Sequence, residues 1–354
     1  MIETGPPWLL AIETSCDDTS VAILRDGIVP MATVSQAQIE PHAIFGGIVP
    51  EVASRIHMQI VDEVCRSALS QAGIKVGEID AVAVTIGPGL PGSLMVGLEF
   101  GRGLAYGLDV PLVPVNHLEG HIAAAWLDVG RPPELPAVAL IVSGGHTELV
   151  CVEAPGRYRV LGRTRDDAAG EAFDKVARML GLGFPGGPKI EQAAATVSST
   201  PIDLPRAWLV GTNDFSFSGL KAAVQRLHDG HLGPDEAARI FSNSDAWTTK
   251  RDWPNRVAHI ALAFEQAVVD VLVRKTIKAA ELNHARSIIL TGGVAANSRL
   301  RREMQAAASV PLHIPLPSRC TDNAAMIGVA GAWAIARGVE SSKHVDIAPG
   351  LRIA

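Results

Sequence analysis

The sequence is poor in cysteine and pairs none of its cysteines closely. Cys16, Cys65, Cys151 and Cys320 form no Cys-x-x-Cys motif in the 354-residue chain. Cysteine zinc sites and disulfide frameworks both require such residues in greater number or at shorter spacing. We therefore expect no cysteine-based zinc site, and we expect a reducing, cytoplasmic location.

Long apolar runs and an excess of basic charge are also absent. No apolar run approaches the ~20 residues that span a bilayer, so we expect no membrane partner. We interpret the short apolar run near the start as a first strand and not as a signal peptide, because no basic segment precedes it. The net charge is −6, from 31 basic and 37 acidic residues, whereas nucleic-acid-binding domains usually carry a basic patch. An RNA substrate would therefore need a local docking surface or a partner protein.

Strand-like and helix-like segments alternate along most of the chain. Residues 8–24 and 137–153 each predict a strand, a polar turn and a second strand, followed by further strands and helices. This alternation predicts an α/β fold of mostly parallel sheets covered by helices. The repeated start predicts two similar halves, 1–133 and 134–354, that face a cleft. We expect an irregular polar insertion at 193–254 within the second half.

Two polar turns, one from each half, are candidates for binding phosphate. The first contains Asp17 and Asp18, and the second, from Ser143 to Thr147, contains two glycines. Glycine lets the backbone approach an anion closely, and backbone N–H groups in tight turns bind phosphate. An ordinary hairpin turn explains one such segment alone, but two in equivalent positions favour a nucleotide in the cleft.

A third turn, at Gly292 and Gly293, follows a buried strand. The glycine pair leaves room for a flat ring or a ribose, which Asn297 is placed to hydrogen-bond. Asn297 is equally suited to cap the helix that follows. Taken alone, the turn favours that simpler role.

His117 and His121 are separated by four positions, so they share one face of a helix and are able to hold a metal together. Asp322, at the start of the last long helix, is the candidate third ligand. Two histidines and one carboxylate leave positions open for a substrate on a first-row metal. Such a pair also occurs on ordinary polar helix faces, and the spacing leaves both interpretations open.

The position of Glu119 argues against a metallopeptidase. In the His-Glu-x-x-His motif the glutamate directly follows the first histidine and activates a zinc-bound water. Here Glu119 comes two positions after His117, so it points about 200° away around the helix.

An acidic segment opens the helix predicted at 168–180. Asp166 and Asp167 suit a first helical turn, where acids complement the helix dipole. Asp174 lies deeper, among apolar residues and close to Gly187 in our interpretation, so it is a candidate acceptor for a ribose or an amino-acid group. For proton removal our hypothesis is Asp17 in the first turn.

Taken in order, eight segments resemble one family, the tRNA N6-adenosine threonylcarbamoyltransferases, formerly described as O-sialoglycoprotein endopeptidases. They run from about residue 11 to about residue 329, and the ordered set is far more specific than any single motif. The segments are AIETSCDDTSVAI, GGIVPEVASRIH, NHLEGHIAA, IVSGGHTEL, DDAAGEAFDKVARMLGLGFPGGP, FSFSGLKAAV, TGGVAANSRLR and CTDNAAMIG.

The resemblance implies an actin-like fold, built from two ribonuclease-H-like halves. It implies transfer of a threonylcarbamoyl group from threonylcarbamoyl-AMP to N6 of adenosine 37, in tRNAs reading codons that begin with A. It implies three partners, namely tRNA, an inactive paralogue of the same fold and a small P-loop ATPase.

The resemblance also implies a set of site residues. A divalent metal would bind His117, His121 and Asp322, with Fe2+ the usual assignment and Zn2+ the alternative. ATP or ADP with Mg2+ is a further candidate ligand. The adenylate and its substituents would bind Ile141, Val142, Ser143, Gly144, Gly145, Asp174, Gly187 and Asn297.

Two other functions are alternatives. A small-molecule kinase of the same fold would need magnesium on oxygen ligands and not on imidazoles. A non-catalytic paralogue that serves as a scaffold would be expected to lack the metal residues, and this chain has all three candidates. The segment 242–255 fits none of the motifs, and the sequence assigns it no role.

Overall fold

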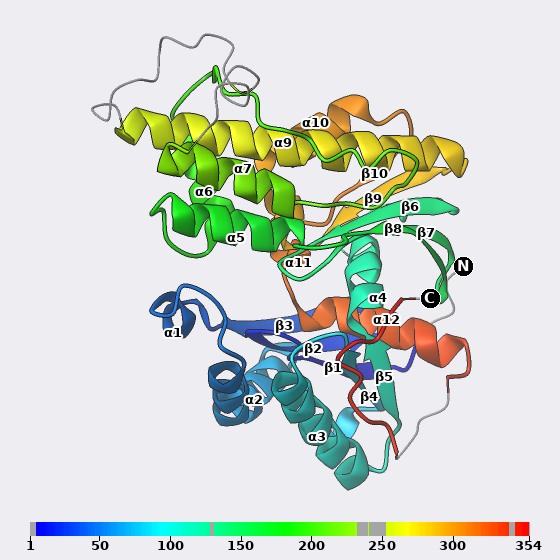
Figure 1. Cartoon of the computed structure of the whole chain (residues 1–354). Helices are drawn as coiled ribbons and strands as arrows, with labels where there is room; N and C mark the ends of the chain where they lie inside the picture. Colours follow the sequence, from blue (N-terminus) through cyan, green and yellow to red (C-terminus); the bar gives the residue numbers. More distant parts are fainter. Residues whose placement is uncertain (1–4, 128–130, 232–239, 241–252, 340–343, 354) are drawn as a thin grey trace.

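Two five-stranded sheets with the same strand order form the centre of the molecule (Figure 1). The computed structural model describes residues 5–127, 131–231, 240, 253–339 and 344–353. The first sheet has the order β3-β2-β1-β4-β5, with β1 Trp8–Glu13, β2 Asp18–Arg25, β3 Val29–Ala37, β4 Ala81–Gly87 and β5 Leu112–Asn116. The second has the order β8-β7-β6-β9-β10, with β6 Ala137–Val142, β7 Thr147–Ala154, β8 Arg157–Arg163, β9 Ser287–Thr291 and β10 Leu312–His313.

Both sheets are mixed, so the expectation of mostly parallel sheets was wrong. In the first sheet β1, β2 and β3 pair antiparallel, and β1, β4 and β5 pair parallel. The second sheet repeats this pattern, with β6 in the place of β1. The short strand-turn-strand segments cause the difference, because a tight turn can join only antiparallel neighbours.

Helices form three layers around the two sheets (Figure 1). The outer face of the first sheet packs against α2 Pro50–Ala72 and α3 Pro91–Leu108. The outer face of the second sheet packs against a larger group that includes α5 Ala169–Met179, α6 Gly186–Ala194, α7 Ser218–Asp229 and α9 Trp253–Leu282. Between the sheets lie α4 His117–Ala123 and α12 Ala324–Ala336. The other helices of the described residues are α1 Ile39–Ala43, α10 Ser298–Ala307 and α11 Pro317–Cys320, with 3₁₀ turns at Val76–Glu78, Ala124–Trp126 and Gly293–Ala296.

The two inner helices each cover the sheet of the other half. On α4, which follows the last strand of the first sheet, Leu118 and Ile122 pack against β6 and β9 of the second sheet. α12 follows the second sheet in the chain but packs against Leu9 and Ala11 of β1. The two helices also contact each other, so each half supplies part of the other's core.

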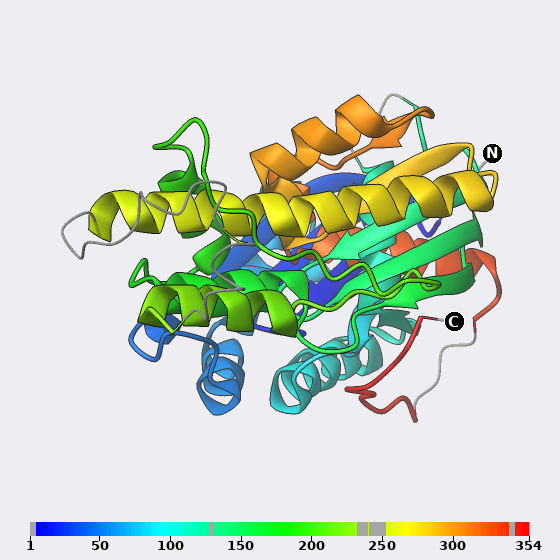
Figure 2. The ribbon, with the colours of Figure 1, turned by 45° about the horizontal axis from the view of Figure 1, so that its top comes forward.

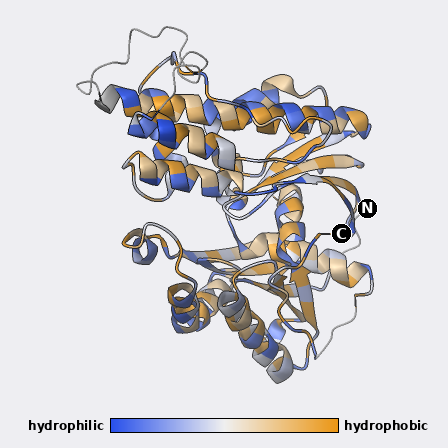
Figure 3. Cartoon of the chain, viewed as in Figure 1, coloured by the Kyte–Doolittle hydropathy of each residue, from blue (hydrophilic) through white to orange (hydrophobic). Residues whose placement is uncertain are grey.

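Hydropathy explains this arrangement (Figure 3). The α12 sequence is apolar on every side, and all its residues from Ala324 to Ala334 are buried. A helix without a polar face is stable only where it is covered all round. The strand β1 is similar, because Leu9 to Ile12 are fully buried on both faces of the sheet.

The insertion predicted as irregular contains a well-packed helix. α7 lies within 193–254 and buries Leu220, Ala223, Val224 and Leu227. Its N-terminus is held by Asp166, whose carboxylate accepts hydrogen bonds from the Ser216 and Ser218 side chains and from backbone N–H groups. The sequence analysis placed Asp166 at the start of its own helix, α5, and missed this contact across the fold. Most of the segment 242–255 lies outside the described residues.

A membrane span needs about 20 apolar residues in one helix. None of the helices in the described part of the chain meets that requirement.

We expect Gly331→Val to destabilise the protein by about 1–3 kcal/mol through overpacking between α12 and the first sheet. A Cβ at Gly331 would lie 2.7 Å from Ala83 Cβ, a contact that requires the helix or the strand to move. Gly103→Val is the matched control, because a Cβ at this position of α3 meets nothing within 4 Å. Urea unfolding of both variants measures the difference, and equal midpoints would contradict this account.

Candidate metal centre and cleft

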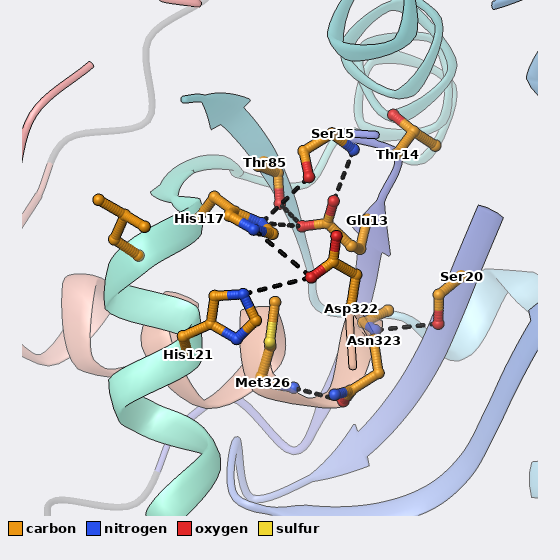
Figure 4. Close-up of polar contacts among 12 residues, drawn as sticks. Glu13, Thr14, Ser15, Ser20, Thr85, His117, His121, Asp322, Asn323 and Met326 are labelled. Carbon is orange, nitrogen blue, oxygen red and sulfur yellow. Dashed lines mark hydrogen bonds and ion pairs between the residues drawn. The ribbon is translucent and has the colours of Figure 1, made fainter. Parts of the chain in front are cut away.

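The inner helices bring together the three residues predicted to bind a metal (Figure 4). The Nε2 atoms of His117 and His121 face the same carboxylate oxygen, Asp322 Oδ1, at 3.6 and 3.2 Å. One ligand atom from each residue lies within 4.8 Å of the others. This set of two imidazoles and one carboxylate is typical of sites for divalent first-row metals.

The buried state of His121 also fits a metal ligand. Its side chain is fully buried, Nδ1 has no hydrogen-bond partner among the described residues, and Nε2 contacts only Asp322 Oδ1 at 3.2 Å, without hydrogen-bond geometry. An unsatisfied buried polar group is costly, and coordination of a cation by Nε2 removes part of that cost.

Glu13 orients His117 from the opposite side. At the end of β1, its Oε2 lies 3.0 Å from His117 Nδ1 and accepts a hydrogen bond from Thr85 Oγ1 at 2.6 Å, while Oε1 accepts one from the Ser15 backbone N–H. A carboxylate on the second nitrogen of a metal-binding imidazole fixes its tautomer and increases its basicity. The Nε2 lone pair of His117 is thereby directed toward Asp322.

Burial and nearby charges shift the pKa values of His117, Asp322 and His146. Burial alone would lower the pKa of His117, but the carboxylates of Glu13 and Asp322 outweigh burial and raise that pKa to about 9. Burial raises the pKa of Asp322, but the adjacent His117 and His121 outweigh burial and lower it. Burial together with the two histidines lowers the pKa of His146, a neighbour from the second half, to about 4. The carboxylates therefore favour positive charge at His117, which a proton supplies below about pH 9 and which a bound metal ion would supply in its place.

Close packing fixes the distance between the ligands. A Cβ on Gly120, between the two histidines, would lie 2.6 Å from Ile327 Cδ1 of α12. Asn116 caps α4 by accepting from Leu118 N, and Asn323 caps α12 by accepting from Met326 N. Each cap is adjacent in sequence to a candidate ligand, so helix start and ligand position are set together.

A cleft of about 430 Å³ opens beside this centre. That volume is within the usual range for small-molecule sites. Asp17 and Asp18 line it from the first half, while Gly144, Asp174, Gly187 and Asn297 line it from the second. Thr321, next to Asp322, also lines the cleft and joins it to the metal centre.

The remaining predicted site residues lie around the Ser143–Thr147 turn. The side chains of Ile141 and Val142 are fully buried in the core on β6, so neither side chain is available to a ligand. Ser143 Oγ accepts a hydrogen bond from the His146 N–H, which closes the turn. Gly145 is exposed and lies outside the lining of the cleft.

Asp174 and Asn297 already have partners within the protein. Asp174 Oδ1 accepts from the Gly186 N–H at 2.7 Å, which leaves its second oxygen for a ligand. Asn297 caps α10 by accepting from Leu300 N, and it donates to Glu265 at 2.8 Å. The simpler capping role proposed for Asn297 is therefore confirmed, and its position in the cleft lining comes in addition.

The first turn forms an acidic wall. Burial raises the pKa of Asp17, and the negative charge of Asp322 raises it further. Burial, followed by Asp322, Asp17 and Glu13, raises the pKa of Asp18 to about 8. His57 supports this turn, with its ring nitrogens close to Thr19 Oγ1 at 2.7 Å and to the Cys16 carbonyl oxygen at 2.9 Å.

Glu13 and His57 are the supporting residues that the sequence analysis missed. Both lie within segments singled out for the resemblance, but nothing in their spacing shows that they meet these partners. Glu119, as predicted, faces away from the metal centre: its Oε1 accepts from Tyr158 at 2.8 Å and pairs with Arg337 at 3.0 Å. This geometry excludes it as the base of a metallopeptidase.

Residues 30–329 match the family model described as tRNA N6-adenosine threonylcarbamoyltransferase. The chain belongs to this transferase family. A transferase of that name from Thermomicrobium roseum is 47% identical over 346 residues, 96% of this chain and 95% of the relative. The relative of that name from Moorella thermoacetica is 50% identical and covers 92% of this chain and 91% of its own length.

The fold is actin-like, as expected, because solved structures of distant proteins with this fold align with the chain. Component A of the (R)-2-hydroxyglutaryl-CoA dehydratase of Acidaminococcus fermentans aligns with a TM-score of 0.51 at 16% identity, over 93% of this chain and 97% of its own. HypF of T. kodakarensis aligns with a TM-score of 0.60 at 12% identity, over 95% of this chain and 49% of its own.

For this transferase family member we expect Glu13→Gln to weaken metal binding by about 10–100-fold. The amide keeps the shape of the side chain but removes the charge that holds His117 Nδ1. Competition with a metal-binding dye measures the affinity. Glu119→Gln is the control, because Glu119 is a buried carboxylate on α4 that faces away from the site, and this variant should keep the wild-type affinity for the metal. Equal losses of affinity in both variants would mean that Glu13 has no special role.

Asp18→Asn should stabilise the metal-free protein at high pH. Because the folded pKa of Asp18 is raised to about 8 from 3.8, the folded state retains a proton that the unfolded state releases, and stability falls as pH rises between those values. The asparagine removes this loss, so Tm at about pH 8 should rise by roughly 2–4 °C for each kcal/mol relieved.

The Tm gain should shrink toward zero near pH 4. Chelator-treated protein in thermal melts provides the measurement, with the exposed Asp62→Asn as control. A gain that does not depend on pH would contradict the role of the raised pKa.

Proposed function

We propose that this protein transfers the threonylcarbamoyl group from threonylcarbamoyl-AMP to N6 of adenosine 37, in tRNAs reading codons that begin with A. The family match over residues 30–329 and the similarity to named transferases over most of their length support this activity. One observation carries the proposal on this chain: His117, His121 and Asp322 converge beside a cleft between the two halves. A scaffold protein has no need of such a centre.

The metal centre suits Fe2+, with Zn2+ the alternative, on His117, His121 and Asp322. A divalent metal bound there would polarise the carbamoyl group as a Lewis acid. The chain's own residues would hold the substrate around it. Two protein nitrogens and one oxygen leave coordination positions for substrate atoms.

The cleft residues would bind the adenylate. Gly144 and the exposed turn beside it would approach the phosphate, and Asp174 would accept hydrogen bonds from the ribose or the threonyl group. Gly187 has no neighbour within 4 Å of where a Cβ would stand, so a ligand has room there. ATP or ADP with Mg2+ is a second candidate occupant of the same cleft, beside the carboxylates of Asp17 and Asp18.

Asp17 is the candidate for removing the proton from N6. It lines the cleft, and burial raises its pKa toward the range in which a carboxylate accepts protons efficiently. The exocyclic amine of adenine is a weak nucleophile, so positioning by the cleft would supply much of the rate. Full turnover of Asp17→Ala with an unchanged pH profile would rule this role out.

We further propose that tRNA, an inactive paralogue of the same fold and a small P-loop ATPase act with this chain in the cytoplasm. A protein partner is supported by exposed apolar side chains on neighbouring elements of the first half. Ile44 is 81% exposed and Met58 is 70% exposed, and Phe45 and Met95 also face solvent. Exposed apolar surface of this kind marks protein interfaces.

Transfer of the labelled threonylcarbamoyl group from threonylcarbamoyl-AMP to unmodified tRNA, with release of AMP, tests the activity in the presence of the partner proteins. We expect label at adenosine 37, and a loss of at least about 100-fold in His117→Ala/His121→Ala because the metal site is removed. His228→Ala/His231→Ala removes two histidines near the end of α7, outside the site, and should keep wild-type transfer. A tRNA with guanosine at position 37 should receive no label.

Absence of transfer by metal-loaded wild type with partners present would exclude the proposed activity. Equal transfer rates in wild type and the double histidine variant would show that the activity does not depend on the metal centre.

A further inference from the structure

A basic hollow lies on the second half and shares no lining residue with the cleft. Its volume is about 300 Å³, and it lies between the loop 208–213 and the C-terminal third of α9. The segment between α6 and α7, which contains this loop, runs along α9 (Figures 1 and 2). From α9 come Arg274, Lys275 and Lys278, and the lining contains no carboxylate.

Two of these cations are arranged in a way that costs the helix stability. Arg274 and Lys278 are four positions apart and both exposed, so they lie on the same side of α9. Like charges at this spacing destabilise a helix. Neither side chain forms an ion pair within the described part of the chain. A bound anion would convert this repulsion into attraction.

Lys275 is a buried cation that points to the floor of the hollow. Its side chain is 6% exposed, and Nζ donates to the Thr212 carbonyl oxygen at 3.0 Å. An ammonium group has three donors, so this bond leaves two for a ligand. Burial lowers the pKa of Lys275, with Asp214 opposing and Lys278 and Arg165 adding to the effect.

An aromatic side chain forms one wall. Trp208 is 37% exposed, and the Arg274 guanidinium carbon lies 5.3 Å from the centre of its ring. Val210, in the same loop, is 97% exposed. The hollow thus combines three positive charges with a flat apolar surface.

The hollow continues into the basic end of β8, which leads toward the cleft. A Cβ on Gly162 would lie 2.4 Å from the Asn213 carbonyl oxygen, so the strand and the loop are in direct contact. β8 carries Arg163 at its end, and Arg165, which follows, is exposed and pairs with Asp214 at 2.9 Å. There the Thr164 N–H donates to the Thr147 carbonyl oxygen at 2.8 Å, in the turn that borders the metal centre.

Building on the proposed function, we propose that this hollow and the adjoining end of β8 bind the sugar–phosphate backbone of the substrate tRNA, away from the modified nucleotide. Lys and Arg contacts to phosphate supply most of the affinity of RNA-binding surfaces, and an exposed tryptophan stacks on an unpaired base. Because the net charge is −6, RNA is attracted to this chain only where basic side chains gather locally, as they do here.

RNA fits the hollow better than an acidic protein does. Carboxylates of a protein partner would satisfy the three cations but would add no planar group to the exposed part of Trp208, one face of which Arg274 already covers. A nucleotide provides both a phosphate and a base within one repeating unit. The concave shape also suits a phosphate group more than a flat protein surface.

The full-length Arg274→Ala/Lys278→Ala variant tests the proposal in two assays. The first measures the Kd of the protein for fluorescent unmodified tRNA at several salt concentrations. The second measures KM and kcat for tRNA in the threonylcarbamoyl transfer assay with partners present. The control, Arg131→Ala/Arg286→Ala, makes the same change in net charge at exposed arginines that pair with Glu134. Thermal melts confirm that both variants fold.

We expect the hollow variant to raise Kd and KM for tRNA by about tenfold or more, to leave kcat unchanged, and to reduce the slope of log Kd against log salt by about 2. The control should behave as wild type. Trp208→Ala should weaken tRNA binding without changing the salt slope, because stacking carries no net charge. Trp208→Phe should restore the binding, because phenylalanine also offers an aromatic ring for stacking.

Unchanged Kd and KM in the hollow variant, with wild type active, would overturn the RNA site while leaving the proposed function intact. The same holds if the variant binds tRNA normally but loses association with a protein partner. An inactive wild type that still binds tRNA through the hollow would instead reject the proposed function alone.

Discussion

The exchange of two helices between the halves is the constraint on which the rest of the structure depends. α4 leaves the first sheet to cover the second, and α12 returns from the second half to cover the first. Because the exchange brings the two helices into contact, His117 and His121 meet Asp322 across about 200 residues of chain. A centre built in this way forms only when both halves are folded and packed together.

Electrostatics at this centre follow from burial. Glu13, His117 and Asp322 form a continuous line of opposite charges in a region that water reaches poorly, where such interactions are strong. Asp17 and Asp18 are largely buried beside it, so burial raises both pKa values, and the negative charge of Asp322 raises them further. Asp18 therefore stays protonated up to about neutral pH.

Local sequence signals predicted the elements well but not their contacts across the fold. The i, i+4 spacing placed His117 and His121 on one helix face and left a plain polar face as the alternative, while Asp322 was a candidate third ligand at the start of the last helix. The resemblance to the transferase family, and not the spacing, implied the complete metal set. Glu13 was missed because its role depends on β1 ending beside α4, which no local pattern shows. Ser216 and Ser218 were placed in an irregular insertion, since the carboxylate that caps α7 comes from Asp166, about 50 residues earlier.

The duplicated sheets carry turns of opposite character at matching positions. After β1 the turn bears two carboxylates, whereas after β6 it bears glycines and a neutral histidine. A ligand that spans the cleft therefore enters an asymmetric field built on a symmetric frame. The acidic turn disfavours a negatively charged group of that ligand, whereas the glycine turn carries no carboxylate, so charge biases the ligand toward one of two opposite orientations before any shape-specific contact is made.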